Sequence, residues 1–89
     1  MKVQKFRKKP VVIEAIHLNK CSFHDSLRFI GDKAKNSYAG KLGGDLCWIE
    51  IATLEGTMTA TENNWIIKGI KGEFYPVKDD IFHETYEKT

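Results

Sequence analysis

The chain has 89 residues but only two cysteines, two prolines and no long apolar run. Cys21 and Cys47 are too few for a disulfide framework, so we expect free thiols and a cytoplasmic protein. No apolar segment approaches the roughly 20 residues that span a membrane. Residues 10–13 run into Glu14 too soon to form a secretory signal. The sequence therefore predicts a cytoplasmic chain without a membrane partner.

Catalytic and metal-binding motifs are also missing. There is no Gly-x-Ser-x-Gly nucleophile motif and no Gly-Lys-Ser/Thr phosphate loop. Cys21 and His24 are three positions apart, but no second pair completes a zinc pattern. We therefore expect no metal and no cofactor, and the sequence leans away from an enzyme. Glu14, His17 and Glu73 would serve catalysis only if the fold brought them together.

Basic residues are concentrated at the N-terminus. Five of the fourteen basic residues lie within the first nine positions, and the rest of the chain holds nine basic and twelve acidic residues. We interpret residues 1–9 as a basic leader on a slightly acidic body. This short leader argues against nucleic acid as the partner, because such binding needs many phosphate contacts.

Hydrophobic alternation predicts strands, and one stretch has helical spacing. Strands are expected over 11–18, 46–54, 57–61, 65–70 and 73–77, and a helix over 22–30 between the cap Ser22 and Gly31. Residues 32–45 have no sustained period and predict a mobile loop, with or without a short helical start. Residues 79–87 form either a short helical turn or an edge strand. The fold class is α+β: one domain over 1–89, with a bent, mostly antiparallel sheet of about five strands, one main helix and a short C-terminal helical turn.

The stretch 65–77 is the expected structural centre of the chain. Its aromatic and β-branched residues predict two buried strands, with Gly69 and Gly72 as turn residues of positive φ. Pro76 predicts a chain reversal. In the strand 46–54, the face that carries Ile49 and Ile51 should point into the core.

Basic and aromatic residues near this centre form a candidate site for an anionic ligand. Lysines and an arginine would contact phosphates, Trp65 and Tyr75 would stack on a base, and Glu14 or Glu73 would accept hydrogen bonds from ribose hydroxyls. Core packing is an alternative role for the aromatic residues, and a solvated face for the lysines. The candidate ligand-binding residues are Arg7, Lys8, Lys9, Glu14, Trp65, Lys68, Lys71, Glu73, Tyr75 and Lys78.

Three segments resemble small proteins of tailed phages and prophages related to the PGDYG family. They are Arg7-Lys8-Lys9-Pro10-Val11-Val12-Ile13-Glu14-Ala15, Thr53-Leu54-Glu55-Gly56, and the C-terminal pattern from Trp65-Ile66-Ile67-Lys68-Gly69 through Gly72-Glu73-Phe74-Tyr75-Pro76-Val77-Lys78 and Asp80-Ile81-Phe82 to Thr85-Tyr86-Glu87. The chain departs from the family pattern at Asn63-Asn64, where relatives carry Gly-Asp, and at Asp79, where they carry proline.

The resemblance implies a phage origin and no defined activity. Small accessory phage proteins often antagonise host defence, and some sequester nucleotide immune signals without cleaving them. We therefore expect a non-enzymatic, counter-defence protein that binds a small anionic, nucleotide-like ligand. The alternative is a protein-interaction module that inhibits or redirects a host protein. Because a small monomer has little room for a deep pocket, we also expect a homo-oligomer.

Overall fold

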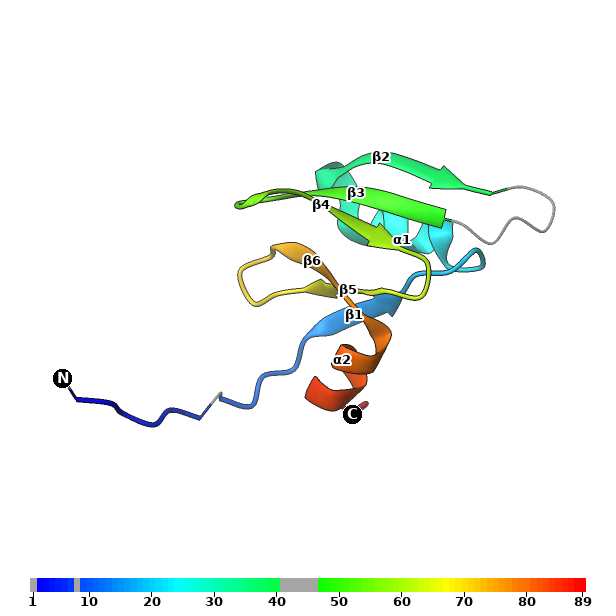
Figure 1. Ribbon diagram of the computed structural model, residues 1–89. Coiled ribbons are helices and arrows are strands. Elements are labelled where there is room, and N and C mark those ends of the chain that lie inside the picture. The colour runs from blue at the N-terminus through cyan, green and yellow to red at the C-terminus, as the bar shows by residue number, and fades with distance from the viewer. Residues whose placement is uncertain (1, 8, 41–46) are drawn as a thin grey trace.

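The computed structural model describes residues 2–7, 9–40 and 47–89. These residues form six strands, two α-helices and one short 3₁₀ helix (Figure 1). In chain order the elements are β1 (Glu14–His17), α1 (Phe23–Ile30), η1 (Gly31–Lys33), β2 (Ala34–Ala39), β3 (Cys47–Thr53), β4 (Gly56–Thr61), β5 (Trp65–Lys68), β6 (Phe74–Val77) and α2 (Asp79–Thr85).

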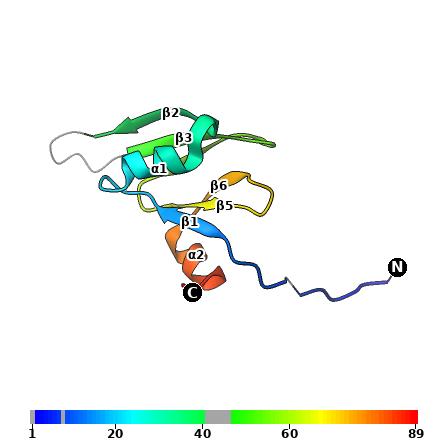
Figure 2. The same cartoon turned by 180° about the vertical axis from the view of Figure 1, so that it is seen from behind.

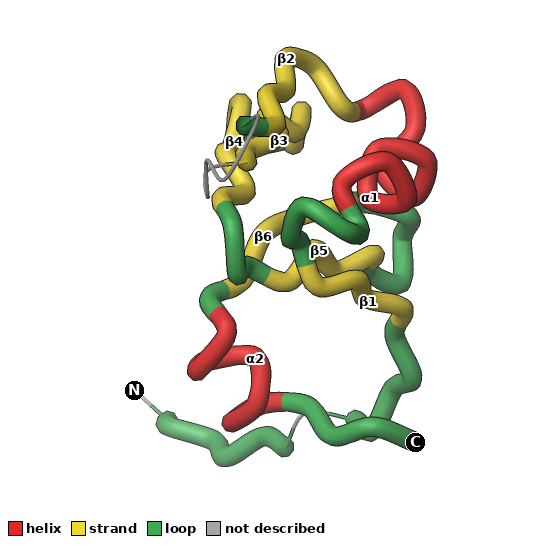
Figure 3. The backbone as a smooth tube through the Cα atoms, turned by 90° about the vertical axis from the view of Figure 1, so that its right-hand side faces the viewer, coloured by secondary structure: helices red, strands yellow, loops and turns green. Residues whose placement is uncertain are grey.

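The strands form two separate antiparallel sheets, so the α+β class is confirmed but the single five-stranded sheet is wrong. One sheet has the order β1-β5-β6 and the other has the order β2-β3-β4. β4 is followed by the turn at Asn63, whose φ is 74°, and β5 then pairs with β1 instead of extending the β2-β3-β4 sheet. The two sheets lie one above the other in Figure 1, and α1 lies beside both in the turned view of Figure 3.

The hydrophobic core lies between these sheets and α1. Ile49 and Ile51 of β3 are fully buried, which confirms the predicted core face of that strand. Ile66 of β5 and Phe74 of β6 belong to the same buried cluster. In Figure 2, which views the molecule from behind, α1 lies in front of the β2-β3-β4 sheet. Because Ile66 and Phe74 contribute to this core, the centre predicted at 65–77 does connect the two sheets.

Helix α1 ends where the sequence predicts, at Gly31 with a φ of 68°. Its N-terminus differs, because Ser22 makes no side-chain cap of the helix. Instead the Ser22 hydroxyl donates to the carbonyl of His17 and accepts a hydrogen bond from the backbone N–H of Asn19. The serine therefore fixes the tight connection from β1 to α1.

The prediction for 32–45 is correct in its short helical start but wrong for the residues that follow, which form a strand and not a loop. Residues 31–33 form η1, and Ala34–Ala39 form β2, which pairs with β3. The register shifts between Ala34 and Ser37, so β2 contains a bulge that hides the period-2 pattern from sequence inspection. The remaining part of the predicted loop, residues 41–45, lies outside the described residues.

The predicted strands near the centre are shorter in the structure. The predicted strand 11–18 is limited to β1, and residues 65–70 to β5, since Gly69 and Gly72 close the turn to β6. Of these glycines only Gly72 has positive φ, at 82°, so the prediction for Gly69 is wrong. Pro76 does not reverse the chain but pairs with Ile66 inside β6. An edge strand tolerates a proline, because a missing N–H there need not break the ladder.

The C-terminal segment forms helix α2, which excludes the alternative edge strand. It lies on the face of the β1-β5-β6 sheet that points away from α1 (Figure 3). Neither described helix is long and apolar enough to cross a membrane. Among the residues of the predicted basic leader, 2–7 and 9 are exposed and form no helix or strand.

Candidate functional site

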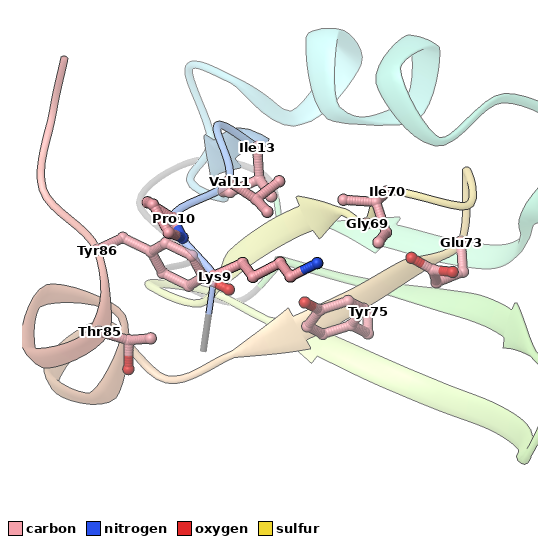
Figure 4. Close-up of a pocket in the computed structure, with 10 residues that line it drawn as sticks. All are labelled: Lys9, Pro10, Val11, Ile13, Gly69, Ile70, Glu73, Tyr75, Thr85 and Tyr86. Atoms are coloured by element: carbon pink, nitrogen blue, oxygen red, sulfur yellow. The ribbon is translucent and has the colours of Figure 1, made fainter. Parts of the chain in front are cut away.

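A groove of about 580 Å³ opens between the N-terminal segment, the β5–β6 turn and the end of α2 (Figure 4). Its walls are mainly apolar and aromatic, with one lysine and one glutamate. The lining residues are Lys9, Pro10, Val11, Ile13, Gly69, Ile70, Glu73, Tyr75, Thr85 and Tyr86. Parts of the chain that are distant in sequence thus meet at one opening.

Two tyrosines form one side of the groove. Tyr75 comes from β6 and Tyr86 follows α2, and a hydrogen bond joins the two side chains. Burial, followed by this hydrogen bond and the neighbouring charges, raises the pKa of Tyr75 above its usual value. In Figure 4 the side chain of Lys9 extends between the two rings. The phenol of Tyr75 therefore stays protonated at physiological pH.

The carboxylate of Glu73 is positioned by the glycine opposite it. A Cβ atom at Gly69 would lie 1.5 Å from Oε1 of Glu73, so the side chain occupies the space that any other residue would fill. The backbone N–H of Gly69 donates a 2.7 Å hydrogen bond to the carbonyl of Glu73. Gly69 does not have a positive φ, so the need for a glycine here comes from the close approach of the Glu73 side chain.

A second, smaller pocket of about 380 Å³ adjoins the groove. The two cavities share Ile13, Gly69 and Ile70. The smaller one adds Glu14 and Lys68, which are directly opposite each other in the β1–β5 register. Side chains of both charges therefore line the adjoining pocket.

The fold brings together half of the predicted site residues. Lys9, Glu73 and Tyr75 line the groove, and Glu14 and Lys68 line the adjoining pocket. Arg7 lies in the exposed N-terminal segment, Lys71 in the β5–β6 turn and Lys78 just before α2, and none of the three lines either cavity. Lys8 lies outside the described residues.

Trp65 is the remaining predicted residue, and its indole faces α2. The indole nitrogen donates a 2.8 Å hydrogen bond to Asp79. The ring of Phe82 stacks on the indole, with centroids 4.1 Å apart and planes within 4°. The indole also packs against His17, at a centroid distance of 5.1 Å. One face of the indole is thus covered by a residue of its own chain.

A polar cluster around Asp79 was not predicted from the sequence. Nε2 of His83 lies 3.2 Å from Oδ1 of Asp79, and Nε2 of His17 lies 3.9 Å from it. The hydrogen bond from Trp65, with the nearby histidines, lowers the pKa of Asp79 below its usual value. Only the four-residue spacing of Asp79 and His83 on one helix could have indicated part of this cluster.

The ring of His17 is oriented by two hydrogen bonds. Oδ1 of Asn63 can only accept, so Nε2 of His17 donates across the 2.7 Å contact. Nδ1 accepts from the amide nitrogen of Asn19 at 3.2 Å, and the amide oxygen of Asn19 is fixed by the N–H of Ser22. Both ring nitrogens are engaged, which argues against His17 as a catalytic base.

The cysteines and acidic groups do not assemble into a metal centre. Across 2–7, 9–40 and 47–89, no group of three or more His, Cys, Asp or Glu side chains could hold a metal ion. Cys21 is exposed and Cys47 is buried, and neither forms a disulfide. Burial, followed by the nearby Glu62, raises the pKa of Cys47, so its thiol is a poor nucleophile.

The groove beside Tyr75 is therefore the best-defined candidate site in the described chain. It combines apolar walls with a few polar groups, which is the usual composition of small-molecule sites. The resemblance to the PGDYG family stays a prediction. No protein-family model, curated protein or solved structure matches this chain.

Proposed function

We propose that this protein binds a small anionic, nucleotide-like ligand in the groove between its N-terminal segment, the β5–β6 turn and α2. One observation carries the proposal. Five residues chosen from sequence for this chemistry, from three separate segments, line two adjoining cavities. They are Lys9, Glu14, Lys68, Glu73 and Tyr75.

The chemistry of the lining matches the parts of such a ligand. Tyr75 and Tyr86 offer ring faces on which a base stacks, with a contribution of about 1–3 kcal/mol per base. Lys9 in the groove and Lys68 in the adjoining pocket supply ammonium groups for phosphates. Glu73 supplies acceptors for sugar hydroxyls or a base edge.

This function needs no reaction, because the protein only has to hold the ligand. In a phage, a protein that holds a host nucleotide signal would lower its free concentration and so counter defence. The groove is open, so a second copy that covered it would strengthen binding. We propose the homo-oligomer on this ground.

Calorimetric titration with cyclic dinucleotides and ADP-ribose tests the proposal. We expect one ligand class to bind, and Lys9→Ala and Tyr75→Ala to weaken its affinity at least about tenfold, since one tenfold step is about 1.4 kcal/mol. Lys35→Ala is the matched control, because this exposed lysine on β2 lines neither cavity. Absence of heat with every nucleotide in the folded protein would refute the proposal.

The alternative, a module that binds a host protein, is favoured by the exposed apolar side chains of the N-terminal segment. Val3, Phe6 and Val12 are 85%, 87% and 79% exposed. Such side chains are typical of an interaction surface. A pull-down from host lysate with the wild type and with Phe6→Ser tests it. Recovery of one host protein by the wild type alone would favour this alternative.

A further inference from the structure

The outward face of the β2-β3-β4 sheet carries a second set of aromatic and polar groups. Strand alternation places Cys47, Ile49 and Ile51 in the core, so Trp48 and Glu50 point to the opposite face. The registers place Tyr38 opposite Trp48 on one side and Thr61 on the other. This face belongs to the other sheet from the groove, and the proposed function makes no use of it.

Two rings form a platform on this face. Tyr38 and Trp48 have centroids 6.3 Å apart, and their planes differ by 24°. Tyr38 is 52% exposed, so the pair does not fill the core. A cross-strand aromatic pair stabilises a sheet by only about 0.2–1 kcal/mol. Trp48 is half-buried, so both rings keep aromatic surface against which a ring-shaped ligand can pack.

Hydrogen-bonding groups lie in the next row of the same face. The amide nitrogen of Asn36 donates a 2.9 Å hydrogen bond to Oε1 of Glu50. This bond orients a carboxylate and an amide side by side, and Oε2 of Glu50, which makes no hydrogen bond among the described residues, can accept from a ligand. Thr59 is opposite Glu50 in the register, and Thr57, Thr59 and Thr61 are all exposed. The row therefore offers carboxylate, amide and hydroxyl groups next to the rings.

Charge separates the two classes of ligand that stack on aromatic rings. Single-stranded nucleic acid needs cations along its backbone. The strands β2, β3 and β4 contain one basic residue, Lys35 in the bulge, and one acidic residue, Glu50. A nearly neutral platform with one oriented carboxylate fits a neutral ligand that has many hydroxyl groups. We propose that the face made by Tyr38, Trp48, Asn36 and Glu50 binds a carbohydrate.

In this arrangement the C–H face of a sugar ring packs on Tyr38 and Trp48, where the rings carry partial negative charge. The sugar hydroxyls donate to Glu50 and accept from the amide of Asn36. Successive rows along a strand are about 7 Å apart, so an oligosaccharide extends from the rings across Glu50 and Thr59. The geometry favours a chain of sugars over a single ring.

Backbone amide NMR of the 89-residue chain tests the proposal, with cellohexaose, chitohexaose and maltohexaose as probes. We expect at least one to shift the amides of Tyr38, Trp48 and Glu50. Trp48→Ala and Tyr38→Ala should each weaken its affinity at least about tenfold, since stacking on aromatic rings contributes measurably to binding. Glu50→Gln, which removes no packing, should weaken it even if the aromatic variants fail to fold. Leu54→Ala is the control, because Leu54 is fully exposed in the β3–β4 turn. This variant should bind the oligosaccharide as tightly as the wild type does.

Two outcomes would overturn the proposal. One is that none of the three oligosaccharides shifts these amides at roughly 10 mM. At that concentration even a ligand with a Kd of about 1 mM would occupy most of the protein. The other is that an oligothymidylate shifts the same amides at lower concentration than any sugar, which would assign the face to single-stranded nucleic acid. Nucleotide binding in the groove would be unaffected by either result.

Discussion

The indole nitrogen of Trp65 lies 2.8 Å from the carboxylate of Asp79, the first residue of α2, and donates a hydrogen bond to it. None of the residues of α2, all of which the structure describes, is fully buried. This bond and the stacking of Phe82 on the indole therefore do much to hold the helix on the sheet. Because Thr85 and Tyr86 line the groove, the Trp65–Asp79 contact also sets the position of one groove wall.

Replacing Asp79 by asparagine should make the Tm of the protein less dependent on pH in the acidic range. The hydrogen bond from Trp65 lowers the pKa of Asp79 from its usual value of 3.8. A lowered pKa stabilises the fold above the usual value, and this contribution is lost as the pH falls through the lower, folded value. The Tm of the wild type should exceed that of Asp79→Asn at neutral pH, and the difference should shrink as the pH falls below about 4.

A double-mutant cycle with Trp65→Phe isolates the cause. Phenylalanine keeps an aromatic ring against Phe82 but removes the N–H donor. In this background the change in Tm caused by Asp79→Asn should depend less on pH. Equal pH dependence in both backgrounds would show that the histidines, and not Trp65, control the charge of Asp79.

Replacing Tyr86 by phenylalanine should lower the pKa of Tyr75 toward its usual value of 10.0. Burial is the largest cause of the raised pKa, so part of the shift should remain, while the part due to the hydrogen bond disappears. A raised pKa means that the folded state favours the protonated phenol over the tyrosinate. The fold therefore loses stability as the pH rises from the usual tyrosine pKa through the higher pKa of the folded protein. The chain has three tyrosines, so an alkaline titration followed by NMR of the individual tyrosine rings measures the pKa of Tyr75 in the wild type and in the variant. An unchanged midpoint would contradict the hydrogen bond.

Alanine at Gly69 and at Gly72 should act differently although both lie in one turn. Gly72 has a φ of 82°, so Gly72→Ala should destabilise the fold by about 1–2 kcal/mol. At Gly69 the three atoms nearest to an added Cβ all belong to the side chain of Glu73, which can move. Gly69→Ala should therefore displace that carboxylate and alter nucleotide binding with a smaller loss of stability. Urea denaturation and calorimetric titration of both variants check this contrast, and equal losses of stability would refute it.

Replacing Ser26 by alanine should leave the protein as stable as the wild type, or more stable. The hydroxyl of Ser26 is buried and has no hydrogen-bond partner among the described residues. A buried polar group without a partner destabilises a fold by about 1–3 kcal/mol. The control is Ser22→Ala, which removes the bonds to His17 and Asn19 and should lower the Tm. A lower Tm for Ser26→Ala would indicate a partner for this hydroxyl.

The sequence predicted local structure well where the pattern was regular. Ile49 and Ile51 alternate with the less buried Trp48, Glu50 and Ala52 and are buried as expected, and Gly31 ends α1 with positive φ. The pattern failed at β2, because a bulge between Ala34 and Ser37 breaks the alternation of polar and apolar residues. It also failed at Pro76, because sequence alone does not distinguish a turn proline from one on an edge strand.

Both the sequence and the tertiary structure were needed to define the candidate site. Residue chemistry alone selected Lys9, Glu73 and Tyr75, because few other segments combine basic and aromatic side chains. It could not show that Tyr86 hydrogen-bonds to Tyr75, or that Trp65 turns toward Asp79, since these contacts join residues on different elements.

The sequence by itself determined the α+β class, the helix after Ser22 and the burial of alternate residues in β3, since these follow from side-chain periodicity within one segment. Only the tertiary structure decided that the strands divide into two sheets. That division depends on how β5 pairs with β1, which lies far from it in the chain, and no local pattern encodes such a pairing. The groove and the platform of Tyr38 and Trp48 exist only because each sheet leaves one face outside the shared core.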